Sequence, residues 1–158
     1  MPVLRPITEA EFAAWRDAVI PGYAQEKVRS GDWPPENAVD RARTQLDELL
    51  PQGAATRDNC LFTITGPVDE PVGTLWFAVK ERGGRRVAYI YDVVIAPQYR
   101  RQGHAARAFA ALEQKVAHLG LEGIALHVFG HNQAAHSRYV KLGFVETDIT
   151  MFKPIDAA

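Results

Sequence analysis

The stretch from Val93 to Ala106 constrains the fold of this chain more than any other. It begins as an apolar, β-branched run, is stopped by Pro97, passes through a basic segment that contains Gly103, and then opens an apolar-periodic helix. Backbone N–H groups at the start of a helix lack intrahelical acceptors, and the helix macrodipole and nearby arginines add positive potential. A buried strand that leads into such a loop therefore predicts a phosphate-binding site at the helix N-terminus.

The length and composition are those of one ordinary globular domain. The chain has 158 residues, 47% of them hydrophobic and 23% charged, so we expect a single domain over residues 1–158. Its 18 basic and 19 acidic residues give a formal charge of −1, which provides no field for binding a nucleic acid or a membrane. The N-terminus lacks the apolar core of a signal peptide, and no run approaches the ~18 apolar residues of a membrane span. We expect a cytoplasmic protein.

Helical spacing dominates the first third of the chain. Thr8 and Glu11 form the pattern of a capping box, and apolar residues follow at helical intervals. We expect Pro21 to break or kink this helix, and the pair Pro34-Pro35 suits the first turn of a second one. In order, the pattern predicts a strand over 3–7, helical segments over 9–19 and 23–29, and a helix over 34–50.

Beyond Asn59 an alternation with period two replaces the helical spacing. The pair Gly83-Gly84 is a hairpin signal, and the strand–helix–strand order that follows predicts two parallel neighbouring strands. The expected elements are strands over 61–65, 72–80, 86–95 and 124–129, helices over 102–119 and 130–142, and one or two final strands within 144–152. Together they predict an α/β (α+β) fold with a mixed, mainly antiparallel sheet of six to seven strands and about four helices.

The basic loop does not match the two common nucleotide-binding motifs. A Walker A loop needs Gly-x4-Gly-Lys-Ser/Thr and a dinucleotide fingerprint needs Gly-x-Gly-x2-Gly, whereas this loop holds one glycine. The segment Arg100-Arg101-Gln102-Gly103-His104-Ala105 instead resembles the Gln/Arg-x-x-Gly-x-Gly/Ala loop of the GNAT superfamily of N-acetyltransferases. A second stretch, Asn132-x2-Ala135-x3-Tyr139-x3-Gly143-Phe144, is similar to another motif of that family. The resemblance is strong over 87–152 and weaker over 1–81.

The resemblance implies an enzyme that transfers the acetyl group of acetyl-CoA directly to an amine. The N–H groups of residues 101–106 would receive the pyrophosphate, and residues 93–95 would contact the pantetheine arm where this strand splays away from its parallel neighbour. Asn132 would form a hydrogen bond with the cofactor near the start of the last helix. The cofactor-binding residues implied are Val93, Val94, Ile95, Arg100, Arg101, Gln102, Gly103, His104, Ala105, Ala106, Asn132 and Tyr139.

Tyr139 also occupies the position of the family's usual general acid. A phenol with an unperturbed pKa of ~10 stays protonated at neutral pH and can donate to the CoA thiolate, although the alternative is a tyrosine that only packs its ring. Asp92 is the best candidate for the base because it is a carboxylate in an otherwise apolar, aromatic strand; the alternative is a structural acceptor for a neighbouring turn. Some relatives carry a glutamate where this chain has Tyr89, and the other candidates for the base are Tyr91 and Glu146.

The acceptor is expected to be an amine on a small molecule or on a protein. Tyr23 and Trp33 lie in the broken region between the first helices, and with Tyr91 and His131 they are the candidate substrate-binding residues. The histidines match no zinc signature, so no metal is predicted. Many members of the family are dimers, so a homodimer is compatible with the resemblance. The competing hypothesis is a non-catalytic acyl-CoA-binding regulatory or partner-binding domain.

Overall fold

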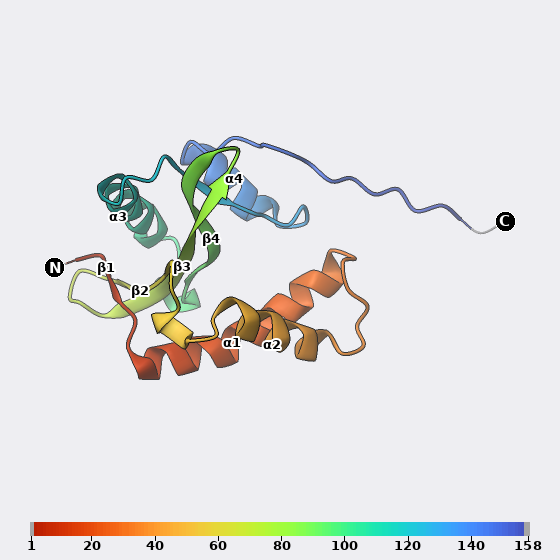
Figure 1. Cartoon of the computed structure of the whole chain (residues 1–158), viewed down its shortest axis with the longest axis horizontal. Helices are drawn as coiled ribbons and strands as arrows, with labels where there is room; N and C mark the ends of the chain where they lie inside the picture. The colour runs from red at the N-terminus through yellow and green to blue at the C-terminus, as the bar shows by residue number, and fades with distance from the viewer. Residues whose placement is uncertain (1, 157–158) are drawn as a thin grey trace.

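The computed structural model describes residues 2–156, which form a sheet with helices on both of its faces (Figure 1). The strands in this range are β1 (Leu4–Pro6), β2 (Asn59–Thr65), β3 (Pro71–Arg82), β4 (Arg85–Ile95) and β5 (Gly123–Leu126). The helices are α1 (Glu9–Arg29), α2 (Ala38–Leu49), α3 (His104–His118) and α4 (Gln133–Lys141), with two short 3-10 turns, η1 (Gly53–Ala55) and η2 (Pro97–Tyr99).

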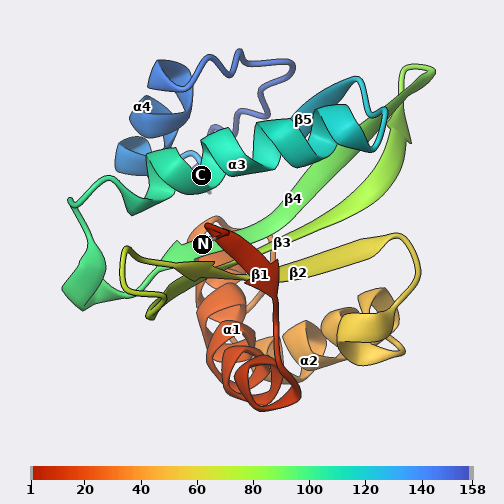
Figure 2. The ribbon, with the colours of Figure 1, turned by 90° about the vertical axis from the view of Figure 1, so that its left-hand side faces the viewer.

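The strands lie side by side in the order β1-β2-β3-β4-β5. Neighbours from β1 to β4 are antiparallel, whereas β4 and β5 are parallel and are joined through α3. Figure 2 shows α1 and α2 below the sheet and α3 and α4 above it. The mixed α/β fold and the parallel pair are confirmed, but the predicted count of six to seven strands is wrong, because residues 2–156 contain five.

Each face of the sheet has its own hydrophobic core. Phe77 and Leu112 are fully buried in the core between the sheet and α3. Trp15 and Trp76 lie in the second core, between the sheet and the helices α1 and α2. Adjacent positions on β3, Trp76 and Phe77, therefore supply opposite cores, as the period of two requires. A side chain on β4 reaches one core or the other according to its register with β3.

The strands that were predicted but do not form are those within 144–152. Residues 144–156 form no helix or strand; Phe144 and Glu146 still contact the helices, and the rest of the segment projects away from the molecule (Figure 1). The alternation in this segment is real, but a strand also requires a neighbour with free backbone groups. Among the described residues, no strand pairs with it.

The first helix is longer than predicted. α1 continues from Glu9 to Arg29 with Pro21 inside it, so of the expected break or kink at Pro21 the break is wrong. A proline removes one backbone hydrogen bond, while Ile20 and Ala24 on either side of it are buried against the core beneath the sheet. This packing holds the helix together across the proline.

Other elements begin later or end earlier than their patterns predicted. α2 begins at Ala38 rather than at Pro34, because its N-cap Asn37 has a left-handed φ of 62°, which a right-handed helix cannot contain. β5 ends at Leu126 rather than Phe129 because its partner β4 separates from it there. α3 and α4 begin two and three residues later than predicted, after N-capping residues.

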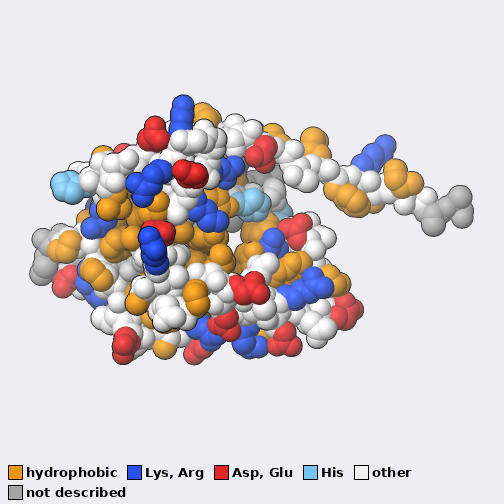
Figure 3. Space-filling view, viewed as in Figure 1, with side chains coloured by type: hydrophobic (Ala, Val, Ile, Leu, Met, Phe, Trp, Pro, Cys, Tyr) orange, Lys and Arg blue, Asp and Glu red, His pale blue; other side chains and the backbone are white. Residues whose placement is uncertain are grey.

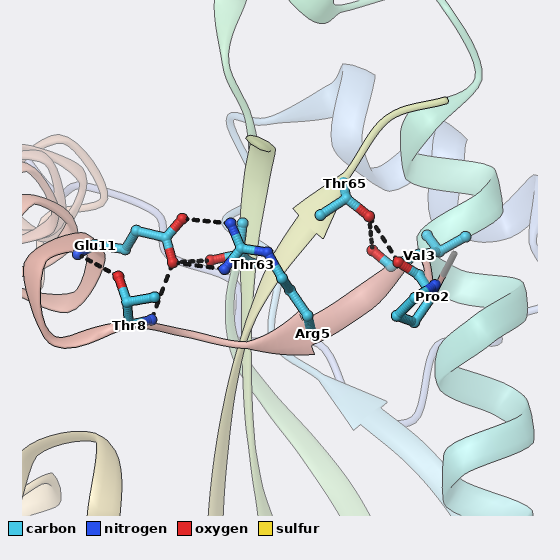
Figure 4. A network of polar contacts seen from close by, with 7 residues as sticks. All are labelled: Pro2, Val3, Arg5, Thr8, Glu11, Thr63 and Thr65. Carbon is cyan, nitrogen blue, oxygen red and sulfur yellow. Dashed lines mark hydrogen bonds and ion pairs between the residues drawn. The ribbon is translucent and has the colours of Figure 1, made fainter. Parts of the chain in front are cut away.

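A polar network fixes the first turn of α1 to the sheet (Figure 4). The Thr8 hydroxyl accepts from the N–H of Glu11, and the Glu11 carboxylate accepts from the N–H of Thr8 at 3.0 Å, which confirms the capping box. Arg5 on β1 donates both Nη1 and Nη2 to this carboxylate at 2.8 Å, and the Thr63 hydroxyl on β2 donates to it at 3.0 Å. The bond from Arg5 lowers the pKa of Glu11 from 4.5 to about 2.

Candidate active site

A β-bulge in β4 determines which side chains reach the face covered by α1. Trp76 of β3 is opposite Asp92, and Phe77 is opposite Ile90, so Tyr91 has no partner residue on β3. The Tyr91 ring stacks on Trp76, with centroids 4.5 Å apart. Asp92 points to the same face, where its carboxylate oxygen Oδ2 accepts a 2.9 Å hydrogen bond from Nε1 of Trp15. Strict alternation would have turned Asp92 to the opposite face, beside Ile90.

This environment favours a basic carboxylate at Asp92. Burial raises the pKa of Asp92, and the hydrogen bond from Trp15 opposes that rise. Asp92 is a structural acceptor, as the alternative allowed, but its donor is a tryptophan of α1 and not a neighbouring turn. Trp15 itself was not predicted as part of the site, since its apolar helical spacing marks it only as a core residue.

Tyr139 on α4 lies on the other face of the sheet. Its ring packs edge-on against Phe109 and Phe144, with centroids 5.9 Å and 5.7 Å away. Burial raises the pKa of Tyr139, nearby Arg138 lowers it, and the charge of Asp92 raises it further. Tyr139 packs against the core between the sheet and α3, whereas Asp92 bonds to Trp15 on the face that α1 covers.

The two parallel strands pair over only part of their length. β4 pairs with β5 from Val87 to Ile90, opposite Gly123 to Leu126, and then continues to Ile95 without a partner on that side. Residues 91–95 of β4 thus have no partner strand on the side where β5 has ended, which leaves a gap between the two strands, although the Ile95 carbonyl accepts from Nε of Arg100. This gap begins beside Asp92, and the residues expected to contact pantetheine, Val93, Val94 and Ile95, lie along it.

The loop after β4 has the backbone of an anion-binding turn. Arg101 and Gly103 both adopt left-handed conformations, with φ of 62° and 81°. The first intrahelical bond of α3 runs from the N–H of Arg107 to the carbonyl of Gly103 at 3.1 Å. By helix geometry, the N–H groups of residues 103–106 have no intrahelical acceptor, and they start a helix whose dipole favours an anion.

Hydrogen bonds from side chains of the loop and of the first turn of α3 stabilise the loop. Nε of Arg100 donates to the carbonyl of Ile95 at 3.0 Å, and Nε2 of Gln102 donates to the carbonyl of Gln98 at 3.2 Å. His104 is buried, and Nη2 of Arg107 lies 2.7 Å from its Nδ1. A guanidinium has only donors, so Nδ1 of this imidazole accepts. Arg101 and Ala106 are exposed on the loop and first helical turn, and Ala105 is half-buried between them.

Three of the four candidate substrate-binding residues lie near the end of α1, whereas Tyr91 stacks on Trp76 of β3. Tyr23 and Trp33 pack edge to face with ring centroids 5.7 Å apart. His131, in the loop before α4, is held by Glu26 of α1 through a 2.5 Å contact between Nε2 and Oε2. Glu26 was not predicted, and its helical position gave no signal of this contact, which joins residues 105 positions apart.

Asn132 serves as the N-cap of α4. Its Oδ1 accepts a hydrogen bond from the N–H of Ala135 at 3.2 Å, so the amide oxygen is used within the first turn of the helix.

Within residues 2–156, no group of three or more His, Cys, Asp or Glu side chains is placed to hold a metal ion. None of the described helices is long and apolar enough to cross a membrane.

Comparisons with known proteins agree with this arrangement. A family model described as the acetyltransferase (GNAT) family matches residues 23–144. The Bacillus subtilis protein named uncharacterized N-acetyltransferase YycN is 35% identical over 97% of this chain and 98% of its own. The crystal structure of YycN matches 98% of both chains with a TM-score of 0.91. A second Bacillus subtilis protein, named uncharacterized N-acetyltransferase YdgE, is 30% identical over 96% of this chain and 97% of its own.

More distant structures share the fold. That of AAC(6′)-Iy in complex with the bisubstrate analogue CoA-S-monomethyl-acetylneamine matches 98% of this chain and 97% of its own, with a TM-score of 0.61 and 18% identity. The family match covers both motifs of the site and most of the sheet, and the YycN match extends over nearly the whole chain. The chain therefore belongs to the GNAT acetyltransferase family and is an N-acetyltransferase.

Proposed function

We propose that residues 1–158 act as one domain that moves the acetyl group of acetyl-CoA to a primary amine in one direct transfer. The observation that carries this proposal is the bulge in β4. It turns Asp92 toward α1 at the point where β5 leaves β4, while Tyr139 packs against the core on the opposite face. A carboxylate and a phenol, both able to exchange protons, therefore lie on the two faces of the sheet.

The residues around the gap between β4 and β5 fit acetyl-CoA, which supplies the acetyl group as a thioester. The free N–H groups of 103–106 and the exposed Arg101 suit its pyrophosphate. The open edge of β4 at 93–95 suits the amides of the pantetheine arm, which would pair with it as an added strand does. The side chains of Arg100 and Gln102 stabilise the loop through hydrogen bonds to backbone carbonyls, and Asn132 is the N-cap of α4.

Asp92 and Tyr139 handle the two protons of the transfer. The Asp92 carboxylate accepts the proton that the amine nitrogen loses as its new C–N bond forms. The Tyr139 hydroxyl donates its proton to the sulfur as the C–S bond breaks. Burial raises the pKa of both groups, which strengthens the carboxylate as a base and keeps the phenol protonated.

The acceptor amine binds on the α1 side of the gap. Tyr91 lies beside Asp92 on this face, and the Tyr23–Trp33 pair and His131 lie near the end of α1. Aromatic faces of this kind suit a positively charged amine, which releases one proton to solvent before the neutral nitrogen attacks. We also keep a cytoplasmic location as a prediction.

The test is acetyl-CoA turnover, followed by the release of free thiol. The amine panel holds amino acids, polyamines, a neamine-type aminoglycoside, and peptides with a free N-terminus or a lysine. We expect thiol release that depends on one class of amine, and Tyr139→Phe should lower kcat by roughly 10²-fold or more with little change in CoA affinity. Binding of acetyl-CoA without release for any amine would instead favour the non-catalytic acyl-CoA-binding domain.

A further inference from the structure

Three basic side chains lie together at the end of the β3–β4 hairpin. Lys80, Arg82 and Arg85 are all exposed, and Arg82 is directly opposite Arg85 across the two strands. The turn that joins these strands stands out from the rest of the sheet (Figure 2). Like charges directly opposite one another destabilise a sheet unless a negative charge neutralises them. We call these three residues the basic cluster.

The basic cluster lies on the same face of the sheet as Asp92. Trp76 contributes to the core on the α1 side and Phe77 to the core on the α3 side. Because side chains alternate along a strand, positions 78, 80 and 82 share the face of Trp76. Arg85 is opposite Arg82 and therefore belongs to this face as well.

The described residues provide no acidic partner for the basic cluster. None of the ion pairs within residues 2–156 includes Lys80, Arg82 or Arg85. The neighbouring Glu81 is directed to the other face by the same alternation. Figure 3 shows Lys and Arg side chains over hydrophobic surface in the middle of the view, whereas many Asp and Glu side chains lie along its lower edge, over α1 and α2.

A row of aromatic rings joins the basic cluster to the proposed base. Tyr91 directly precedes Asp92, and its ring packs edge-on against Tyr89 with centroids 5.0 Å apart. Nζ of Lys80 lies 4.9 Å from the ring centroid of Tyr91 and 5.1 Å from that of Tyr89. The guanidinium carbon of Arg82 lies 5.9 Å from the Tyr89 centroid. The base and the cations are therefore two ends of one aromatic surface.

Three acidic side chains on the α1 side of the sheet already have partners. Glu26 contacts His131, Asp32 pairs with Lys27 at 3.3 Å, and Asp92 accepts a hydrogen bond from an indole. An acceptor with several amines would therefore meet like charge at the basic cluster. An acceptor with a negative group would find donors there that no protein carboxylate uses.

We propose that the acceptor is a small amine that also carries an oxyanion, a carboxylate or a phosphate, and that Lys80, Arg82 and the Tyr89 hydroxyl bind this group. The inference rests on the proposed acetyl transfer and names the class of its acceptor. Ammonium and guanidinium groups form charge-assisted hydrogen bonds with both kinds of oxyanion. Burial raises the pKa of Tyr89, so its phenol stays protonated and can donate as well.

The spacing of the two ends favours an acid group several bonds from the amine. Lys80 is four residues along β3 from Trp76, the partner of Asp92, which corresponds to about 13 Å of strand. The side chain of Lys80 lies over Tyr91, which brings the ammonium closer to Asp92 than this. An ω-amino acid or an aminoalkyl phosphate can therefore place its amine at Asp92 and its oxyanion at the basic cluster.

Matched pairs of amines test this proposal in the acetyl-transfer assay. One pair is 4-aminobutyrate and its amide, the other is 3-aminopropyl phosphate and 3-aminopropanol, and spermidine represents the polycations. We expect kcat/KM to be at least roughly tenfold higher for an acid than for its neutral counterpart, and lowest for spermidine. The pair with the larger preference identifies the oxyanion as carboxylate or phosphate. No preference in either pair, or a preference for spermidine, would overturn the proposal.

Variants of the basic cluster assign the preference to its residues. Lys80→Gln should raise KM for the preferred acid at least roughly tenfold, with little change in kcat and none for the neutral amine, and Lys80→Arg should restore most of the loss. Lys115→Gln is the matched control, because Nζ of Lys115 on α3 also lies over an aromatic ring, 5.0 Å from the centroid of Phe62. Equal effects of Lys80→Gln and Lys115→Gln would contradict the assignment.

Isothermal titration of the same amines into the protein saturated with CoA does not require turnover. If no amine is acetylated, the proposed acetyl transfer fails, but binding of an acid that Lys80→Gln weakens still supports the oxyanion site. If each acid binds no better than its neutral counterpart, or binds equally well to Lys80→Gln, the oxyanion site is wrong even where acetylation occurs. Circular dichroism and CoA affinity check that each variant is folded.

Discussion

Trp15 on α1 donates its indole N–H to the carboxylate of Asp92 on β4 at 2.9 Å, and the two residues are 77 positions apart in the chain. The contact exists because the bulge at Tyr91 turns Asp92 to the face that α1 covers. Burial raises the pKa of Asp92, and this hydrogen bond opposes the rise. In the proposed mechanism, Trp15 is therefore a positioning residue that acts through Asp92.

Replacing Trp15 with phenylalanine removes the donor and keeps an aromatic ring in the core. The pKa of Asp92 should rise further, because the ionised carboxylate loses its hydrogen bond. The proposed base is active when ionised, so the acid limb of the kcat/KM profile should move to higher pH by about one pH unit. The measurement is the pH dependence of acetyl transfer.

Trp76→Phe is the matched control for this change. Trp76 belongs to the same aromatic core, but its Nε1 donates to Asn59 at 2.8 Å and not to Asp92. The control should lose stability without moving the acid limb. Equal shifts in both variants would mean that Trp15 acts through packing alone.

Asp92→Asn should separate activity from stability. The variant keeps an oxygen that can accept from Trp15 but cannot take a proton, so turnover should fall by about 10²–10⁴-fold. Because the folded state raises the pKa of Asp92, its ionised form opposes folding at pH values above the ordinary 3.8. Thermal unfolding of the variant at neutral pH should therefore occur at the same or a higher temperature.

Asp47→Asn provides the comparison for this variant. Asp47 pairs with Arg16 at 2.6 Å on the surface, with 60% of its side chain exposed. The same chemical change there should leave turnover intact. An Asp92→Asn enzyme within twofold of the parent rate would remove Asp92 from the proposed mechanism.

Gly103→Glu should prevent CoA binding. Gly103 has a φ of +81°, and an added Cβ would lie 3.1 Å from Nη1 of Arg107. The new carboxylate would also compete with the pyrophosphate for the N–H groups of α3. Isothermal titration with CoA should show an affinity loss of more than roughly tenfold, equivalent to ~1.4 kcal/mol.

Gly83→Glu controls for backbone strain and added charge. Gly83 lies in the β3–β4 turn with a φ of +58° and open space around it. This variant should lose a similar amount of folding stability, because a side chain is strained at a positive φ, and it should bind CoA normally. If the two variants bind CoA equally well, the assignment of the loop to pyrophosphate is wrong.

Glu11→Gln should weaken the fold in a pH-dependent manner. The folded-state pKa of Glu11, about 2, lies below its ordinary 4.5, so the stabilisation is complete above pH 4.5 and is lost as pH falls toward 2. Glutamine still suits a capping box, so the variant isolates the contact with Arg5. The free energy of unfolding at neutral pH should fall by about 1 kcal/mol, with the difference vanishing in acid.

Urea unfolding at several pH values measures this difference. Glu9→Gln is the control, because Glu9 lies in the same first turn of α1 and is exposed. It should change stability little at any pH. A constant deficit of Glu11→Gln across the acid range would show that lost shape, and not lost charge, is responsible.

Features that depend on residues close together in the chain could be predicted from the sequence. The capping box of Thr8 and Glu11 forms as expected, and α3 ends at His118, followed by the C-cap Leu119 and by Gly120, whose φ is +73°. The N–H of Gly120 bonds the carbonyl of Ala117 at 3.1 Å, as a helix-ending glycine allows. The backbone of the loop before α3 could also be predicted from nearby residues, because a proline, a glycine and the start of a helix follow one another within a few positions.

The sequence by itself therefore determined the mixed fold, the turns, and the backbone of the loop before α3, because each follows from local backbone chemistry or from the period of apolar residues. Only the tertiary structure decided the rest. The bulge that turns Asp92 toward Trp15 arises from pairing between β3 and β4, and α1 passes Pro21 because distant residues pack against it. The segment 144–152 has the alternation of a strand but no neighbour among the described strands, and a strand exists only where another supplies its hydrogen bonds.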